Sequence, residues 1–299
     1  MPSSGSQMTY AEFMELFPSN SACLDYLRDR FYGEGTPCPA CAKPSKFHRI
    51  RGRSAYSCQY CRHQVYPTAG TIFHKSTVSL QLWFWAVFLM SSTRCGISAK
   101  QLEREIGVSN KTALRMFRQI RTLLAEDDSL GGGESPVELD ETFYGGKPRA
   151  YSKYPKNSHW DRKQIVMAAV ERQGRIRAKC VPDSRGPVVD QTIREFILPG
   201  SMIYTDEYRG YNSLGKKGYS HRRVNHTAKI YVDGTVHTNT IEGFFGLVKN
   251  GIRGVYHSVS RKHLQSYLDE YTFRYNRREG AEPMFWAILN RVQKTQPAA

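Results

Sequence analysis

The sequence predicts a multidomain α/β protein in which a cysteine-rich module, a helical region and a larger domain with a mixed sheet follow one another. Three observations predict this organisation. Two Cys-x-x-Cys pairs lie within residues 36–75, apolar residues at helical spacing fill 76–126, and a succession of strands and one helix begins at 137. The 299 residues, 40% of them hydrophobic, are sufficient for two or more domains with their own cores.

The clearest boundary is a linker at residues 127–136. There, two aspartates precede three consecutive glycines and a proline, a composition that interrupts any helix. We therefore expect an N-terminal helical segment at 1–35, a zinc ribbon at 36–75 and a helix-turn-helix region at 76–126. After the linker at 127–136 we expect a catalytic domain at 137–280 and a C-terminal helix with a tail at 281–299.

The composition favours a nucleic-acid partner. Lys and Arg number 43 against 27 Asp and Glu, a formal net charge of +16, and the pI is near 9.6. A polyphosphate is the natural counter-charge, although basicity alone carries no sequence preference. The longest apolar segment, Leu82–Met90, is too short to cross a bilayer as a helix, and we expect a soluble cytoplasmic protein without membrane partners.

The cysteine pairs have the spacing of a zinc ribbon, with 16 residues between them. Four thiolates complete a tetrahedral Zn²⁺ shell and leave no open position, so this ion would be structural; the ligands would be Cys38, Cys41, Cys58 and Cys61. Disulfides or free thiols are the alternatives, and the odd cysteine total makes disulfides less favoured. His48 and His63 lie nearby, whereas Cys23, Cys95 and Cys180 are expected to be small buried side chains.

The helical region resembles a helix-turn-helix unit. Residues 78–92 predict an apolar helix, and 98–124 divide at Gly107 into two further helices, the second capped by Ser109. Lys111, Arg115 and Arg118 form one basic stripe at i, i+4 and i+7. Such a stripe is often only a solvated face; beside a ribbon it favours DNA contact, to bases or to phosphates.

The largest domain should contain a mixed sheet. Strands are expected at 136–140 and 202–205, a hairpin at 164–170 and 175–181, and a helix at 189–198. The Gly145–Trp160 insert is basic, aromatic and contains proline, which indicates an exposed loop that could touch DNA. Residues 260–278 predict a further helix.

Three carboxylates in this domain suggest a divalent-metal site. Asp140 and Asp206 are each expected at the end of a strand, and Glu242 in a helix with Lys249 two turns further along the same face. Grouped carboxylates repel one another unless a cation lies between them, and oxygen ligands suit Mg²⁺ or Mn²⁺. Ordinary surface acids are the alternative, and Glu138 is a rival ligand because it shares a strand face with Asp140.

Three segments resemble the ISXO-like group of bacterial insertion-sequence transposases, which is related to the Merlin elements: Val137–Lys147, Tyr204–Tyr208 and His237–Phe245. The resemblance extends from roughly Cys38 to Arg278. It implies an RNase H-like (DDE) catalytic fold, with Asp140, Asp206 and Glu242 as metal ligands and Lys249 as the basic residue after the third acid. Some relatives carry Asn in place of the third acid, so Asn239 is a second candidate to complete the site.

The resemblance implies a DNA transposase that cuts at element ends, transfers a 3′-hydroxyl into target DNA, and works as a homo-oligomer on double-stranded DNA. A non-catalytic DNA-binding regulator and a nuclease that cleaves without joining are the alternatives. His237 and His257 flank the third motif, and either could orient DNA or make only local hydrogen bonds.

Overall fold

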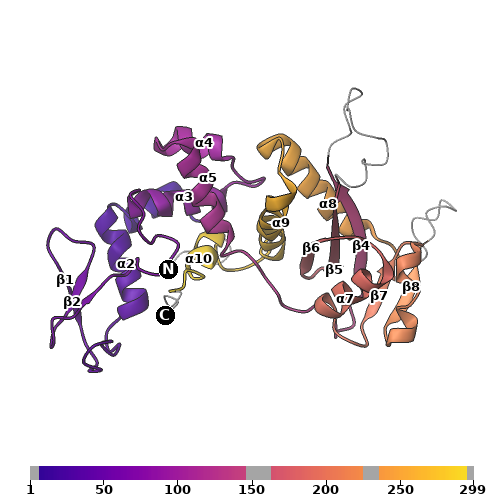
Figure 1. Ribbon diagram of the computed structural model, residues 1–299, viewed down its shortest axis with the longest axis horizontal. Coiled ribbons are helices and arrows are strands. Elements are labelled where there is room, and N and C mark those ends of the chain that lie inside the picture. Colours follow the sequence, from indigo (N-terminus) through magenta and orange to yellow (C-terminus); the bar gives the residue numbers. More distant parts are fainter. Residues whose placement is uncertain (1–6, 146–162, 225–235, 295–299) are drawn as a thin grey trace. The chain divides into compact units, whose positions relative to one another are not determined.

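The computed structural model describes residues 7–145, 163–224 and 236–294 (Figure 1). These residues form two compact units, one from Met1–Leu123 together with Ala281–Ala299 and the other from Leu124–Gly280. Within the described ranges, no helix has both the length and the apolar character that crossing a membrane requires.

The first unit begins with two short helices and a small sheet. Helix α1 (Tyr10–Leu16) starts at a capping box in which the Thr9 hydroxyl and the Glu12 carboxylate each bind the other's backbone N–H, and α2 (Asn20–Tyr32) follows. Strands β1 (Phe47–Arg49), β2 (Tyr56–Cys58) and β3 (Gln64–Val65) then form an antiparallel sheet in that order.

Three helices complete the N-terminal part of this unit: α3 (Leu80–Ser92), α4 (Ala99–Ile106) and α5 (Asn110–Arg121). They confirm the helices expected from the sequence, and the Ser109 side chain caps α5 as predicted. Gly107 ends α4 at φ 70°, a left-handed conformation that favours glycine. The short helix α10 (Met284–Leu289) packs against α3, so the C-terminal segment joins the first unit.

The second unit contains a five-stranded mixed sheet, in the order β6-β5-β4-β7-β8. Its strands are β4 (Val137–Tyr144), β5 (Gln164–Glu171), β6 (Ile176–Val181), β7 (Met202–Thr205) and β8 (Ser220–Arg223). The first three pair antiparallel, and β7 runs parallel to β4. This order confirms the RNase H-like pattern; β8, whose sequence Ser-His-Arg-Arg gives no strand signal, extends it.

Helices cover both faces of this sheet (Figure 1). Helix α7 (Gly186–Phe196) packs against one face in a core that includes Val137, Leu139 and Tyr211. Helices α8 (Asn239–Gly251) and α9 (Arg261–Asn276) share the opposite core with Tyr144. Side chains alternate along β4, so its even-numbered residues face α8.

Two expectations from the sequence were wrong. Asp140 does not end its strand, because β4 continues to Tyr144 and pairs with β5 along the whole of that length; Thr142, Phe143 and Tyr144 are all favourable strand residues. Of the three cysteines expected to be buried, only Cys23 is; Cys95 is exposed, since it follows the C-terminus of α3, and Cys180 on β6 is partly buried. Residues 146–160 of the expected DNA-contacting insert lie outside the described ranges.

Candidate active site and cysteine cluster

Asp140 lies within β4, and Asp206 directly follows the end of β7, the parallel strand beside it. The register of β4 and β7 pairs Glu138 with Tyr204, so each aspartate follows a paired residue by two positions, and the charge of Asp206 acts on Asp140. A turn then holds Asp206 in place, because the Tyr208 backbone N–H donates to its Oδ1 at 2.9 Å. Sheet pairing therefore brings together two carboxylates that are far apart in the sequence.

Glu242 joins them from α8. It lies in the first turn of the helix, and its Oε1 accepts a hydrogen bond from the Thr238 hydroxyl at 3.0 Å. Its side chain is exposed, and its charge acts on Asp140 together with that of Asp206. The three carboxylates are thus close enough to interact electrostatically, although within the described ranges only the four cysteines form a group whose ligand atoms lie within 4.8 Å of one another. Asn239 is the residue that begins α8.

Glu138, the rival ligand, has a different role. It is fully buried, and its carboxylate accepts hydrogen bonds from Arg172 Nε at 2.7 Å, Thr240 N at 2.9 Å, Thr240 Oγ1 at 2.9 Å and Ile241 N at 3.1 Å. His237 Nδ1 lies 3.2 Å from the same carboxylate. Glu138 therefore binds the N-terminus of α8 to β4, and its oxygens are occupied by protein donors.

Burial and neighbouring carboxylates raise the pKa of two acids in β4, Asp140 and Glu141. Burial, followed by the charge of Glu141, raises the pKa of Asp140 to about 8, and Asp206 and Glu242 add to the effect. Burial also raises the pKa of Glu141, whose carboxylate accepts a hydrogen bond from the buried Tyr211 hydroxyl on the α7 side of the sheet. A cation among these groups would relieve the repulsion, so the donor set fits a hard divalent ion such as Mg²⁺.

Lys249 lies on the same side of the sheet as Asp140. Its Nζ donates to the Thr142 hydroxyl at 2.6 Å, and its charge interacts with that of Asp140. Burial and the charge of Arg253 lower its pKa. Lys249, two turns along α8 from Glu242, therefore lies close enough to Asp140 for their charges to interact.

The four ribbon cysteines form one cluster. Their sulfur atoms lie within 4.8 Å of one another, with Cys38 and Cys61 sulfurs at 3.6 Å and those of Cys41 and Cys58 at 3.9 Å. Sulfur atoms bound to one tetrahedral zinc ion would be separated by about 3.8 Å. The cluster therefore fits a structural Zn²⁺, and the Tyr60 N–H donates to Cys58 Sγ at 3.4 Å.

The predicted basic stripe on α5 is exposed at Lys111, Arg115 and Arg118. Arg115 extends back toward α3, where its guanidinium lies 5.7 Å from the Trp83 ring and donates to Ser76 Oγ at 3.4 Å. Lys111 and Arg118 are the outer members of the stripe.

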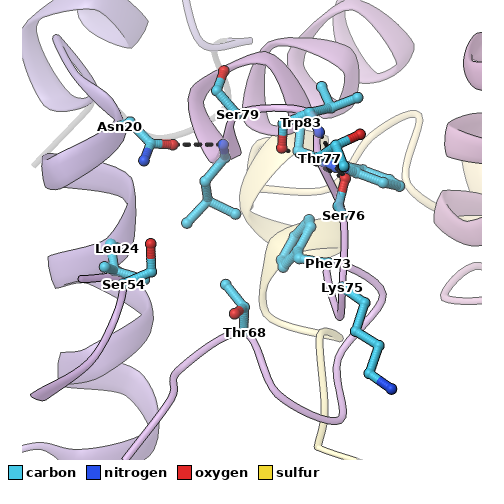
Figure 2. Close-up of a pocket in the computed structure, with 12 residues that line it drawn as sticks. Asn20, Leu24, Ser54, Thr68, Phe73, Lys75, Ser76, Thr77, Ser79 and Trp83 are labelled. Carbon is cyan, nitrogen blue, oxygen red and sulfur yellow. Dashed lines mark hydrogen bonds between the residues drawn. The ribbon is translucent and has the colours of Figure 1, made fainter. Parts of the chain in front are cut away.

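Arg115 thereby borders a polar pocket of about 330 Å³ in the first unit, whose wall includes Ser76 and Trp83. Figure 2 shows Asn20 in this pocket, accepting a hydrogen bond from the first residue of α3, Leu80, at 2.6 Å. Trp83 Nε1 donates to Ser76 Oγ at 2.8 Å. These bonds fix the start of α3 against α2, which is a structural role.

Several residues around the carboxylates were missed in the sequence. Thr142, Arg172 and Tyr211 support the site, but each does so through a contact between distant segments. Only Thr142 carried a signal, because strand alternation places it on the same face as Asp140.

Sequence comparisons link the carboxylate-bearing domain and the cysteine cluster to known families. The family model of the ISXO2-like transposase domain matches residues 129–276, and that of the transposase zinc-ribbon domain matches 18–64. An uncharacterized protein in transposable element ISH50 of Halobacterium salinarum is 28% identical over 279 residues, or 87% of this chain and 92% of that protein. An uncharacterized transposase-like protein of Haemophilus influenzae is 29% identical over 99 residues, 33% of this chain and 79% of that one.

The solved structures that match the chain share little sequence with it. The catalytic core domain of BIV integrase is 13% identical, covers 53% of this chain and 95% of its own, and gives a TM-score of 0.29. The Mos1 strand transfer complex is 8% identical, with coverage of 71% of this chain and 79% of its own, and gives a TM-score of 0.28.

Proposed function

We propose that the chain is a transposase of the ISXO2-like family, which cleaves DNA at the ends of an insertion sequence and joins the exposed 3′-hydroxyl to target DNA. The observation that supports the proposal is that the charges of Asp206, just after β7, and Glu242, at the start of α8, both act on Asp140 in β4. All three lie within the matched transposase domain.

The two proposed steps are displacements at phosphorus. In the first, water attacks the phosphodiester at the element end and the 3′-oxygen leaves as a hydroxyl. In the second, that hydroxyl attacks a target phosphodiester, forms a new ester bond, and displaces the target 3′-oxygen. Neither step requires a covalent bond between the DNA and the protein.

Four residues would act directly. Asp140, Asp206 and Glu242 would hold Mg²⁺ or Mn²⁺, which when bound supplies charge stabilisation to both oxygens of the displacement. Lys249 would hold a backbone phosphate beside them, since its Nζ lies on the Asp140 face. The ribbon would bind structural zinc. Three cationic residues of α5 would contact duplex DNA: Lys111, Arg115 and Arg118. A homo-oligomer would pair the two DNA ends.

Cleavage and joining can be measured together. Wild type and Asp206→Asn are incubated with labelled terminal-repeat duplex and a supercoiled target plasmid, with and without added Mg²⁺, and products are resolved on a sequencing gel. Omitting Mg²⁺, rather than adding a chelator, leaves the zinc ribbon intact. A matched control is Glu279→Gln, whose native side chain is 80% exposed.

We expect Mg²⁺-dependent nicks and joined products from the wild type and Glu279→Gln, and neither from Asp206→Asn, which should still bind the ends. Full activity in Asp206→Asn would refute the ligand assignment. Binding without cleavage by the wild type would indicate a regulator, and cleavage without joining would indicate a nuclease.

A further inference from the structure

A cationic cavity of about 650 Å³ lies next to the carboxylate cluster. It is formed by the end of β4, the start of β5 and the connection between α8 and α9. Four cationic side chains line it, together with His257: Lys163, Lys249, Arg253 and Arg261. Among the described residues of its wall there is no aspartate or glutamate, so the cavity favours an anion.

The wall contains two uncommon backbone conformations. Residues Ile252–Tyr256 form a π-helical turn directly after α8. His257 follows at φ 60° and ψ −45°, and the Ser258 N–H donates to the Tyr256 carbonyl at 2.7 Å, which makes a γ-turn with a positive φ at a residue other than glycine. Both conformations are disfavoured and occur mostly at functional sites.

Lys249 belongs to both the cavity and the carboxylate cluster. It lines the cavity, donates to Thr142 on β4, and interacts with the Asp140 carboxylate. Arg253 lies one helical turn beyond Lys249, and its positive charge acts on the Lys249 ammonium group. A ligand bound between these two cations would therefore lie next to a phosphate held at the carboxylates.

We propose that this cavity is a subsite for an unpaired nucleotide that flanks the scissile phosphate, with Arg253 as the main phosphate contact. The phosphate of a nucleotide carries the negative charge that would complement the cationic side chains of the cavity. The volume of the cavity is in the range of small-ligand sites. A paired base is held in its duplex and would have to leave it to enter. The inference rests on the proposed function, because it takes the carboxylate cluster as the place of cleavage.

Binding of DNA with and without single-stranded ends tests the subsite separately from catalysis. Fluorescein-labelled duplexes, either blunt or with a four-nucleotide 3′ or 5′ extension, are titrated by anisotropy in buffer without added divalent metal. Arg253→Gln removes the charge, and Ser258→Trp fills the cavity from its rim without changing charge. Arg194→Gln, an exposed arginine on α7 over the opposite face, is the matched control.

We expect the wild type to bind one extended duplex more tightly than the blunt one. Arg253→Gln and Ser258→Trp should reduce that preference about threefold to fivefold, the effect of an exposed ion pair, and leave the blunt affinity unchanged. The salt dependence of Arg253→Gln for the extended duplex should also fall by about 0.7 in log–log slope.

Three outcomes would overturn the subsite: equal wild-type affinity for all duplexes, equal loss on blunt and extended DNA in Arg253→Gln, or the same loss in Arg194→Gln. Failure of the proposed function is recognised independently, as absence of Mg²⁺-dependent cleavage by a wild-type protein that still prefers the extended duplex.

Discussion

Glu138 and Asp140 lie on the same face of β4, but their neighbours give them different chemistry. Glu138 is surrounded by donors from Arg172, Thr240 and Ile241, which bind both of its carboxylate oxygens. Asp140 is surrounded by other carboxylates, which raise its pKa to about 8 after the larger effect of burial. One acid therefore attaches a helix, while the other is suited to bind a cation.

Glu138→Gln should destabilise the second unit by about 2 kcal/mol, because an amide cannot accept all the hydrogen bonds that the carboxylate receives from α8 and Arg172. Urea unfolding followed by circular dichroism would measure this. The control is Glu134→Gln, an exposed residue in the linker, for which no change is expected. Equal stability of Glu138→Gln and wild type would contradict the anchoring role.

His221 should make the stability of the second unit depend on pH. Burial, followed by the charge of Arg223, lowers the pKa of His221 to about 4, while its unfolded value is near 6.5. Below pH 6.5 the unfolded chain therefore takes up a proton that the folded chain does not, and stability falls as the pH drops from 6.5 toward 4. His221 Nε2 lies 2.9 Å from the Thr205 hydroxyl, which fits a neutral ring.

In His221→Gln this part of the pH dependence should disappear. Urea midpoints at pH 7 and pH 5 would differ less in the variant than in the wild type. Substituting the exposed His48 with Gln provides the comparison, since its removal should leave the difference intact. An unchanged pH dependence in His221→Gln would show that another group is responsible.

At the scale of elements, the packing of α8 against α9 depends on Gly251. A Cβ built at this buried glycine would lie 1.7 Å from the Tyr271 hydroxyl oxygen, within the core that carries α8. Gly246, in the same helix, has no neighbouring atom within 4 Å of such a Cβ. One glycine is thus required by helix packing and the other is not.

The two alanine substitutions should have opposite signs. Gly251→Ala forces α8 and α9 apart and should cost about 1–3 kcal/mol of stability, whereas Gly246→Ala should stabilise the helix by up to about 1 kcal/mol. Thermal and urea unfolding of both variants would measure the difference. If Gly251→Ala proved as stable as Gly246→Ala, the close approach of the two helices would be wrong.

Elements with strong local patterns could be predicted from the sequence. Apolar periodicity gave α3, α4 and α5, and β-branched residues bounded by turns gave β7 and the β5–β6 hairpin. Strand β8 could not be predicted, because its Ser-His-Arg-Arg sequence is a strand only through pairing with β7. The role of Glu138 was equally hidden, since the donors around it come from α8 and from Arg172, which directly follows β5.

At the scale of the whole molecule, the chain forms two compact units with different sources of stability. The unit made by Leu124–Gly280 has helices on both faces of a five-stranded sheet, while the N-terminal part of the other includes strands of only two or three residues beside the four cysteines. Such a small sheet has little apolar surface to bury, so zinc should supply much of its stability.

Cys58→Ser should therefore release zinc and lower the unfolding transition of the first unit without moving that of the second. Atomic absorption would give the zinc content, and denaturant unfolding followed by circular dichroism would separate the two transitions. Cys95→Ser is the matched control, because Cys95 is exposed and lies outside the cluster. Retention of one zinc ion per chain in Cys58→Ser would refute four-cysteine coordination, and parallel loss of both transitions would show that the units unfold together.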